Sequence, residues 1–172
     1  MNLTDNDFVL FGLPEQFALD RIDLDDRWRK LQASAHPDKF AAEGAAAQRV
    51  AMQWSVRINE GYRRLREPLS RAGYLCELRG ASIDAERNTA MPAAFLMQQM
   101  GWREALDDAR GDAEVLAALD AEVRRTEHEL HQVARLLDDE QMPAAAAERV
   151  RALMFIQKFR RDVAHRLEET SS

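Results

Sequence analysis

The sequence predicts an all-α protein built from two helical domains. Apolar residues recur at intervals of three and four along most of the chain, which is the spacing of amphipathic helices. Alternation with a period of two, rich in β-branched residues, is nearly absent, so no sheet is expected. The composition agrees, because 46% hydrophobic and 31% charged residues with only 7 Gly and 5 Pro are typical of a helix-rich globular chain.

Three helices are expected in the N-terminal part. A short helix around Asp7–Gly12 ends at its glycine, and Asp20 is placed to cap a second helix. The second helix must end at His36, because Pro37 disfavours the α conformation of the residue before it. A third helix is expected over residues 45–67. The second and third helices each carry an apolar stripe, formed by Leu24, Trp28, Leu31 and Ala35 and by Val50, Trp54, Ile58, Tyr62 and Leu65. These stripes can bury each other in an antiparallel pair if the first helix covers the open side.

The C-terminal part predicts a three-helix bundle. Residues 77–90 are rich in Gly, Ser, Asn and charged residues, which indicates a linker between a domain at 1–76 and a domain at 91–172. The first expected helix runs from Pro92 to about Ala109, and the third from Pro143 to about Glu168. The second carries a heptad seam, whose positions are Leu116, Leu119, Val123, Thr126, Leu130, Val133 and Leu137. Short connections favour antiparallel packing of the three.

The charge is unevenly distributed, and this limits the possible partners. Residues 1–76 contain 11 Lys and Arg and 11 Asp and Glu, so the other 13 basic and 19 acidic residues, and the whole net charge of −6, fall in residues 77–172. Contacts with phosphates need a dense basic surface. An acidic C-terminal half therefore argues against nucleic acid as the partner of that half.

The sequence also indicates a cytoplasmic protein without a cofactor. No stretch approaches the roughly twenty apolar residues of a membrane-spanning helix, and the first residues are acidic where a secretory signal would be basic and then apolar. Cys76 is the single cysteine, so it can neither form an internal disulfide nor take part in a cysteine cluster for a metal. We expect a structural thiol and no membrane partner.

His36-Pro37-Asp38 lies between two amphipathic helices, and the helix before it carries basic residues beside its apolar stripe. In this setting the tripeptide resembles the invariant motif of J-domain proteins, the co-chaperones of DnaK-type ATPases. The resemblance implies recognition without chemistry: Pro37 stiffens the loop, and Asp38 accepts hydrogen bonds from an arginine of the chaperone. The implied chaperone-binding residues are Arg27, Arg29, Lys30, His36, Pro37, Asp38 and Lys39. Ala35 departs from the pattern, since many J domains have an aromatic residue there.

Further segments resemble the HscB type of J-domain protein, which serves iron-sulfur cluster assembly. They are Leu10-Phe11-Gly12-Leu13-Pro14, His36-Pro37-Asp38-Lys39-Phe40, Ile58-Asn59 with Tyr62, Pro68, Arg71-Ala72, Tyr74-Leu75 and Phe95-Leu96-Met97. The likeness covers almost the whole chain. It implies two protein partners, an HscA/DnaK-type chaperone whose ATPase is stimulated and the iron-sulfur scaffold IscU, and no catalytic residue in the chain itself.

Helical periodicity independently indicates a second apolar face on the helix that starts near Pro92. At 100° per residue, one face is predicted to be core and holds Met91, Phe95, Trp102, Leu106 and Ala109. Leu96, Met97 and Met100 point to a different side, followed there by acidic residues. In the last helix the core stripe is formed by Leu153, Ile156, Val163 and Leu167, while Met154 and Phe155 lie off it. Phe155 is therefore expected to be exposed.

The HscB resemblance assigns a partner to this second face. It implies that the scaffold docks on Leu96, Met97, Met100, Glu104, Asp108 and Phe155. Two positions depart from the family pattern: Asp108 is shorter than the usual glutamate, and Gly101 replaces an acidic residue. The alternative is that Met97, Met100 and Phe155 only fill gaps between helices, because Met is a common packing residue.

Two other functions remain as alternatives. The first is a general J-domain co-chaperone with other clients. The second is a metal-dependent enzyme using His128 and His131, which stand three residues apart. Zinc proteases have their two histidines four residues apart, and no third ligand is evident. A solvated helix face is the favoured interpretation of this histidine pair.

Overall fold

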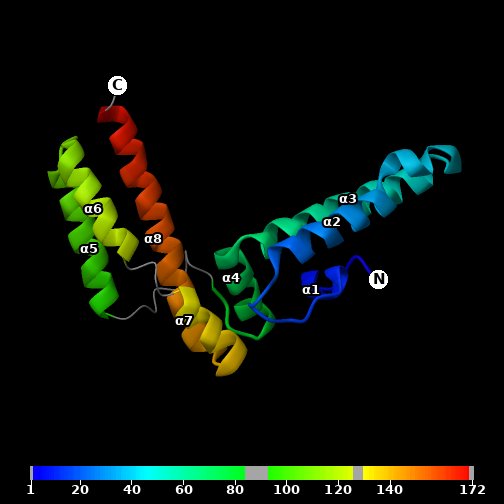
Figure 1. The fold of residues 1–172 in the computed structure, drawn as a ribbon, viewed down its shortest axis with the longest axis horizontal. Coiled ribbons are helices and arrows are strands. Elements are labelled where there is room, and N and C mark those ends of the chain that lie inside the picture. The colour runs from blue at the N-terminus through cyan, green and yellow to red at the C-terminus, as the bar shows by residue number, and fades with distance from the viewer. Residues whose placement is uncertain (1, 84–92, 126–129, 171–172) are drawn as a thin grey trace. The chain divides into compact units, whose positions relative to one another are not determined.

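The computed structural model describes residues 2–83, 93–125 and 130–170 of the chain (Figure 1). Every element of regular structure in these residues is helical, which confirms the predicted all-α fold. The chain divides into two compact units, Met1–Leu75 and Cys76–Ser172. Each unit is described by itself below.

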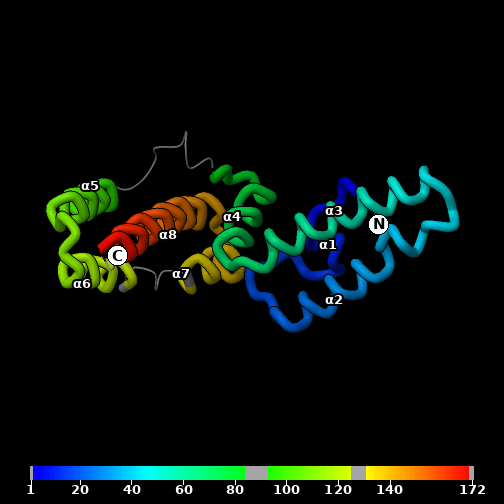
Figure 2. Tube along the Cα trace, turned by 90° about the horizontal axis from the view of Figure 1, so that it is seen from above, coloured from blue at the N-terminus to red at the C-terminus, as the bar shows by residue number. Residues whose placement is uncertain are grey.

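The first unit is a helical hairpin with a short helix beside it. Its elements are α1 (Asp7–Phe11), α2 (Arg21–Ala35), the 3-10 helix η1 (Pro37–Glu43), α3 (Ala45–Arg66) and the first turns of α4 (Pro68–Leu78). Figure 2 shows α2 and α3 side by side. The predicted signals at both ends of α2 are confirmed, because the Asp20 side chain accepts a hydrogen bond from the Ile22 N–H and the helix ends before His36.

Toward the loop end some apolar side chains of the hairpin are exposed, whereas those at the end that α1 covers are closely packed. Phe8, Phe11, Leu24, Ile58 and Leu65 are buried there. Val50 was predicted to share the core stripe but is 52% exposed. The reason is the length of α1, which has five residues and packs beside Gly61, where an added Cβ would lie 3.0 Å from the Phe11 ring. It therefore covers the Gly61 end of α3 and leaves Val50 open.

A buried carboxylate fixes α1 to α3. The Asp7 side chain is fully buried and forms ion pairs with Arg57 at 2.8 Å and with Arg64 at 2.6 Å. Arg57 also donates hydrogen bonds to the backbone carbonyls of Leu3 and Asp5. The hydrogen bond to Asp7 raises the pKa of Arg64 further above its usual range. This network satisfies a charge that would otherwise be costly to bury, and helical periodicity gives no sign of it.

The second unit is the predicted three-helix bundle. Its elements are α5 (Ala93–Asp108), α6 (Ala113–Arg125), α7 (Leu130–Ala134), the π-helical turn η3 (Arg135–Asp139) and α8 (Pro143–Thr170). The heptad positions Leu116, Leu119, Val123, Val133 and Leu137 are all buried. Thr126 and the side chain of Leu130 lie outside the described part of the chain.

The first residues of the predicted linker pack into this second unit. Ile83 is 6% exposed, and Arg151 of α8 donates a hydrogen bond to the Ser82 carbonyl at 3.0 Å. Arg79 likewise donates a hydrogen bond to the Leu137 carbonyl. The composition of this segment gave no sign of these contacts, because they join arginines and carbonyls that are 69 and 58 residues apart in the sequence. Residues 84–90 of the predicted linker lie outside the described residues.

Cys76 is buried at the start of the second unit. Burial raises the pKa of its thiol to about 11, because a thiolate is poorly solvated in an apolar interior. The thiol therefore stays protonated near neutral pH, as expected of a structural cysteine.

Candidate partner-binding sites

The loop between α2 and α3 is a capped turn. His36 is extended, with φ −64° and ψ 128°, and Pro37 occupies the first position of η1, where a missing N–H costs nothing. The His36 Nδ1 accepts a hydrogen bond from the Asp38 N–H at 3.2 Å, and the Lys39 N–H donates to the His36 carbonyl at 3.0 Å. The imidazole and the proline together hold the turn in one conformation.

This turn presents a carboxylate to solvent. The side chain of Asp38 is 92% exposed, and its Oδ2 lies 3.6 Å from the His36 Nδ1. Lys39 is exposed as well. A solvated carboxylate on a fixed backbone turn is suited to accept hydrogen bonds from a cationic group of another protein, because the backbone does not have to be ordered on binding.

The three basic residues predicted on α2 are not equivalent. Arg29 is largely exposed and pairs with Asp26 at 3.2 Å, and Lys30 is exposed. Arg27 instead donates hydrogen bonds to the carbonyls of Phe11 at 3.0 Å and Gly12 at 3.1 Å. Its guanidinium thus joins the end of α1 to α2, a role that one helix's sequence cannot reveal. Arg29 and Lys30 are the more exposed cations of α2, and the Arg27 side chain is still 39% exposed.

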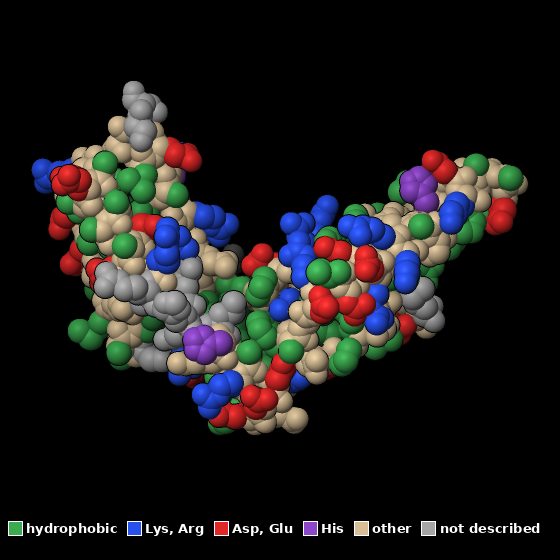
Figure 3. Space-filling model, in the orientation of Figure 1, with side chains coloured by type: hydrophobic (Ala, Val, Ile, Leu, Met, Phe, Trp, Pro, Cys, Tyr) green, Lys and Arg blue, Asp and Glu red, His purple; other side chains and the backbone are tan. Residues whose placement is uncertain are grey.

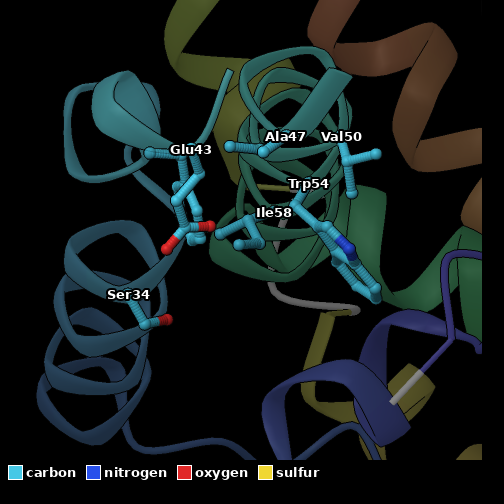
Figure 4. Close-up of a pocket in the computed structure, with 9 residues that line it drawn as sticks. Ser34, Glu43, Ala47, Val50, Trp54 and Ile58 are labelled. Carbon is cyan, nitrogen blue, oxygen red and sulfur yellow. The ribbon is translucent and has the colours of Figure 1, made fainter. Parts of the chain in front are cut away.

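An apolar groove of about 450 Å³ lies next to the loop (Figure 4). It is lined by Ser34, Ala35, Phe40, Glu43, Ala47, Val50, Ala51, Trp54 and Ile58. In Figure 4, Ser34 of α2 and Glu43 of η1 lie on one side of the groove, and Val50 and Trp54 of α3 lie on the other. Three of the lining side chains, Ala35, Ala47 and Ala51, are small and leave this space open.

On α5 the structure separates two apolar faces as periodicity predicted. Trp102, Leu106 and Ala109 are buried, Phe95 is half-buried, and Met91 lies outside the described residues. Leu96 is 39%, Met97 72% and Met100 65% exposed. Figure 3 shows hydrophobic side chains at the surface over the first turns of α5. The exposed Met97 and Met100 do not fill gaps between the helices of this unit.

Acidic residues continue this face toward the end of α5. Glu104 and Asp108 are exposed, and neither forms an ion pair within the described residues. Asp107 differs, because it pairs with Arg166 of α8 at 3.2 Å. The face formed by Leu96, Met97, Met100, Glu104 and Asp108 is called the α5 face below.

Phe155 was expected to be exposed, and this expectation is wrong. The ring is half-buried, stacks on Phe159 with centroids 6.1 Å apart and meets the edge of Phe95 at 6.1 Å. The Arg103 guanidinium lies over it, 5.5 Å from the centroid. Large rings from α5 and α8 fill the space between these helices, and periodicity along α8 alone cannot show how far the side chains of α5 reach. Leu153, Ile156 and Val163 are buried as predicted, whereas Leu167 and Met154 are half-buried.

The histidine pair gains no support as a metal site. His131 is exposed, and His128 lies outside the described residues. Among the residues that the structure describes, no group of three or more His, Cys, Asp or Glu is arranged to hold a metal ion. A search of the described helices for a long, apolar segment able to span a bilayer also finds none.

The chain is similar to known proteins over both of its units. A family model described as the HscB C-terminal oligomerisation domain matches residues 91–164. The Co-chaperone protein HscB homolog of Bordetella petrii is 50% identical over 161 residues, which cover 93% of this chain and 95% of the relative. The homolog of Burkholderia vietnamiensis is 50% identical over 171 residues, covering 98% of this chain and 97% of the relative.

Two solved structures superpose on this chain over nearly its full length. Chaperone HscB from Vibrio cholerae superposes with a TM-score of 0.81 at 35% identity, covering 96% of this chain and 99% of that one. Human co-chaperone protein HscB superposes with a TM-score of 0.85 over 95% of this chain and 83% of that one. Its identity of 24% supports the fold alone. The identity and coverage of the bacterial relatives, together with the J-type loop and the helical bundle, show that this chain belongs to the HscB family of co-chaperones.

Proposed function

We propose that the chain binds an IscU-type iron-sulfur scaffold, delivers it to an HscA/DnaK-type chaperone and stimulates the ATPase of that chaperone. In this role it aids iron-sulfur cluster assembly and transfer in the cytoplasm, and it catalyses no reaction itself. The observation that carries the proposal is the 92% exposed carboxylate of Asp38 on a capped turn in a chain of the HscB family.

The first unit, as a J domain of about residues 1–76, supplies the contact with the chaperone. The Asp38 carboxylate accepts charge-assisted hydrogen bonds from an arginine of the chaperone. Arg29 and Lys30 lie on the helix that precedes the turn and meet an acidic surface of the same partner, which speeds encounter at low salt. Because His36 and Pro37 already fix the turn, the carboxylate is in position before binding.

The second unit supplies the contact with the scaffold. The α5 face has a centre of Met and Leu side chains and an acidic rim, the arrangement of a transient interface with an apolar core. Phe155 contributes from α8 with the part of its half-buried side chain that stays accessible. With the two binding sites on separate units, the chain can hold a client on one unit while the other engages the chaperone.

Two variants with opposite effects test this proposal. Asp38→Asn removes the charge of a solvated side chain, so it should abolish stimulation of the chaperone's ATPase and leave scaffold affinity unchanged. The paired substitution Met97→Ala with Met100→Ala should weaken scaffold binding at least tenfold, since buried apolar anchors dominate interface energetics, and spare stimulation in the absence of scaffold. Steady-state ATP turnover and calorimetric titration with purified scaffold measure the two activities.

Matched controls separate binding from folding. Glu60→Gln changes an exposed carboxylate elsewhere in the first unit, and Val115→Ala truncates a 44% exposed apolar side chain of α6. Both should leave both activities intact. Wild-type protein that changes no chaperone's ATP turnover would contradict the proposal. Stimulation of a DnaK-type chaperone without any scaffold binding would instead support a general J-domain co-chaperone with other clients.

A further inference from the structure

The two most exposed methionines of residues 2–83, 93–125 and 130–170 lie on α5. Met97 is 72% and Met100 65% exposed, ahead of Met52 at 55% and Met142 at 51%. Met154 is half-buried. Because Met97 and Met100 are three residues apart in a helix, their side chains are neighbours on one surface. This surface therefore carries two thioether sulfurs in contact with water.

A solvated thioether is open to oxidation by a peroxide. One oxygen atom of hydrogen peroxide is transferred to the sulfur: an S–O bond forms, the O–O bond breaks, and the other oxygen leaves as water. The product, methionine sulfoxide, is polar and chiral where the thioether is apolar. Methionine sulfoxide reductases reverse the step, because two thiols are oxidised to a disulfide while the oxygen leaves as water. The modification is thus reversible.

The charge around these two sulfurs selects a neutral oxidant. Glu104 and Asp108 are exposed on the same side of α5. Their carboxylates repel an anionic oxidant such as hypochlorite, whereas hydrogen peroxide carries no charge and is not repelled. An uncharged peroxide therefore reaches Met97 and Met100 without electrostatic hindrance.

Cys76 does not compete for the oxidant. Its side chain is fully buried, and burial raises the pKa of the thiol to about 11. Peroxide attacks the thiolate form of a cysteine, and this form is scarce near neutral pH when the pKa is so high. Among the sulfur-containing side chains that the structure describes, the exposed thioethers are the accessible targets.

We infer that Met97 and Met100 form a reversible oxidation site that controls binding of the scaffold. This inference rests on the proposed function of the α5 face and adds regulation to it. Docking removes both side chains from water, and a sulfoxide oxygen buried there without a hydrogen-bond donor costs free energy that a thioether does not. The loop over residues 36–39 contains no sulfur, so oxidised protein still stimulates the chaperone but no longer holds the scaffold.

Peroxide treatment of the full-length protein tests this inference. Peptide mass spectrometry should find sulfoxide at Met97, Met100, Met52 and Met142 before Met154. Calorimetric titration with a purified IscU-type scaffold should then show binding weakened about tenfold or more, and methionine sulfoxide reductase with dithiothreitol should restore it. The Tm and the stimulation of the chaperone's ATPase without scaffold should stay unchanged, because the oxidised side chains are already in water.

Paired variants assign the effect to named sulfurs. The ratio of the scaffold Kd after peroxide to that before is measured for each protein, so that each protein is its own reference. This ratio should be close to one for Met97→Leu with Met100→Leu, which has no sulfur on the α5 face. It should stay at about tenfold or more for Met52→Leu with Met142→Leu, which removes two exposed thioethers elsewhere. Bound scaffold should also slow the oxidation of Met97 and Met100 but not that of Met52.

The outcomes separate the oxidation site from scaffold binding itself. A loss of affinity in the wild type that disappears when Met97 and Met100 are both replaced supports the site. Wild-type protein that carries both sulfoxides and binds as tightly as before overturns it, while scaffold binding stands. A loss that persists without these two sulfurs overturns it as well, since damage elsewhere would then be responsible. If untreated protein does not bind the scaffold, the proposed function fails and its regulation fails with it.

Discussion

The two ends of the α2–α3 hairpin differ in packing and in charge. At the end next to α1, Leu24 and Leu65 are fully buried and the Asp7 carboxylate is enclosed by two arginines. At the loop end, Val50 is 52% exposed and the Asp38 side chain 92% exposed. One end holds the unit together, and the other is available to a partner.

This difference has a physical consequence for any substitution. A change at the α1 end acts on the free energy of unfolding, because it disturbs buried apolar contacts or a buried charge. A change to an exposed group at the loop end should have little effect on folding, because that group is already in water. Local stability should therefore fall along the hairpin toward the loop, and five substitutions measure how steeply it does so.

Asp7→Asn should have the largest effect on stability. It leaves Arg57, whose side chain is 14% exposed, next to a neutral group, and breaking a buried ion pair by removing one partner costs about 3–5 kcal/mol. Urea unfolding of the first unit, followed by Trp fluorescence, measures the loss. Glu60→Gln, an exposed carboxylate of α3, is the control and should change stability by less than about 0.5 kcal/mol. Equal effects of the two would refute the central role of Asp7.

A matched pair of truncations compares the two ends directly. Leu65→Ala removes a side chain that is 0% exposed and should cost about 2–5 kcal/mol. Val50→Ala removes one that is 52% exposed and should cost less than about 1 kcal/mol. The free energy of unfolding of each variant is measured by urea titration under the same conditions. Similar costs would mean that the loop end is as tightly packed as the α1 end.

Ala35→Phe should stabilise the loop end. The ring can enter the groove of about 450 Å³ beside Trp54, and the apolar area that it buries should contribute about 1 kcal/mol after side-chain entropy is subtracted. A higher unfolding midpoint with a shifted Trp54 emission maximum is the expected result. Destabilisation would show that the groove does not accept a ring. Ala35→Ser is the control, because it changes the residue without filling the groove.

Tyr62→Phe should have the smallest effect, which is present at neutral pH and disappears at acid pH. The Tyr62 hydroxyl donates a 2.6 Å hydrogen bond to Asp25 and is the main reason that the pKa of this carboxyl lies below its ordinary value of 3.8. A folded-state pKa below the unfolded one stabilises the fold above the unfolded value, and this contribution is lost as the pH falls through the folded pKa. NMR titration should show the Asp25 pKa rising toward 3.8 in the variant. An unchanged pKa would assign the shift to Arg21 instead.

Much of the helical organisation follows from residues close together in sequence. Asp20 caps α2 through an N–H two residues away, and Pro37 ends it by clashing with the residue before. The heptad spacing placed Leu116 and Leu137 in the core, and the same reasoning placed Met97 off the core face of its helix. Capping and periodicity involve at most a few turns of one helix, so the sequence alone determines them.

Other features were decided by the tertiary structure. Asp7 meets Arg57 and Arg64 only after α1 packs on α3, Arg27 is drawn to the end of α1, and Phe155 is half-buried because the rings of α5 reach it. Ile83 is buried although its segment has the composition of a linker. The burial of a side chain depends on which distant element covers it and how far that element extends, and this distance information is absent from the local pattern of one helix.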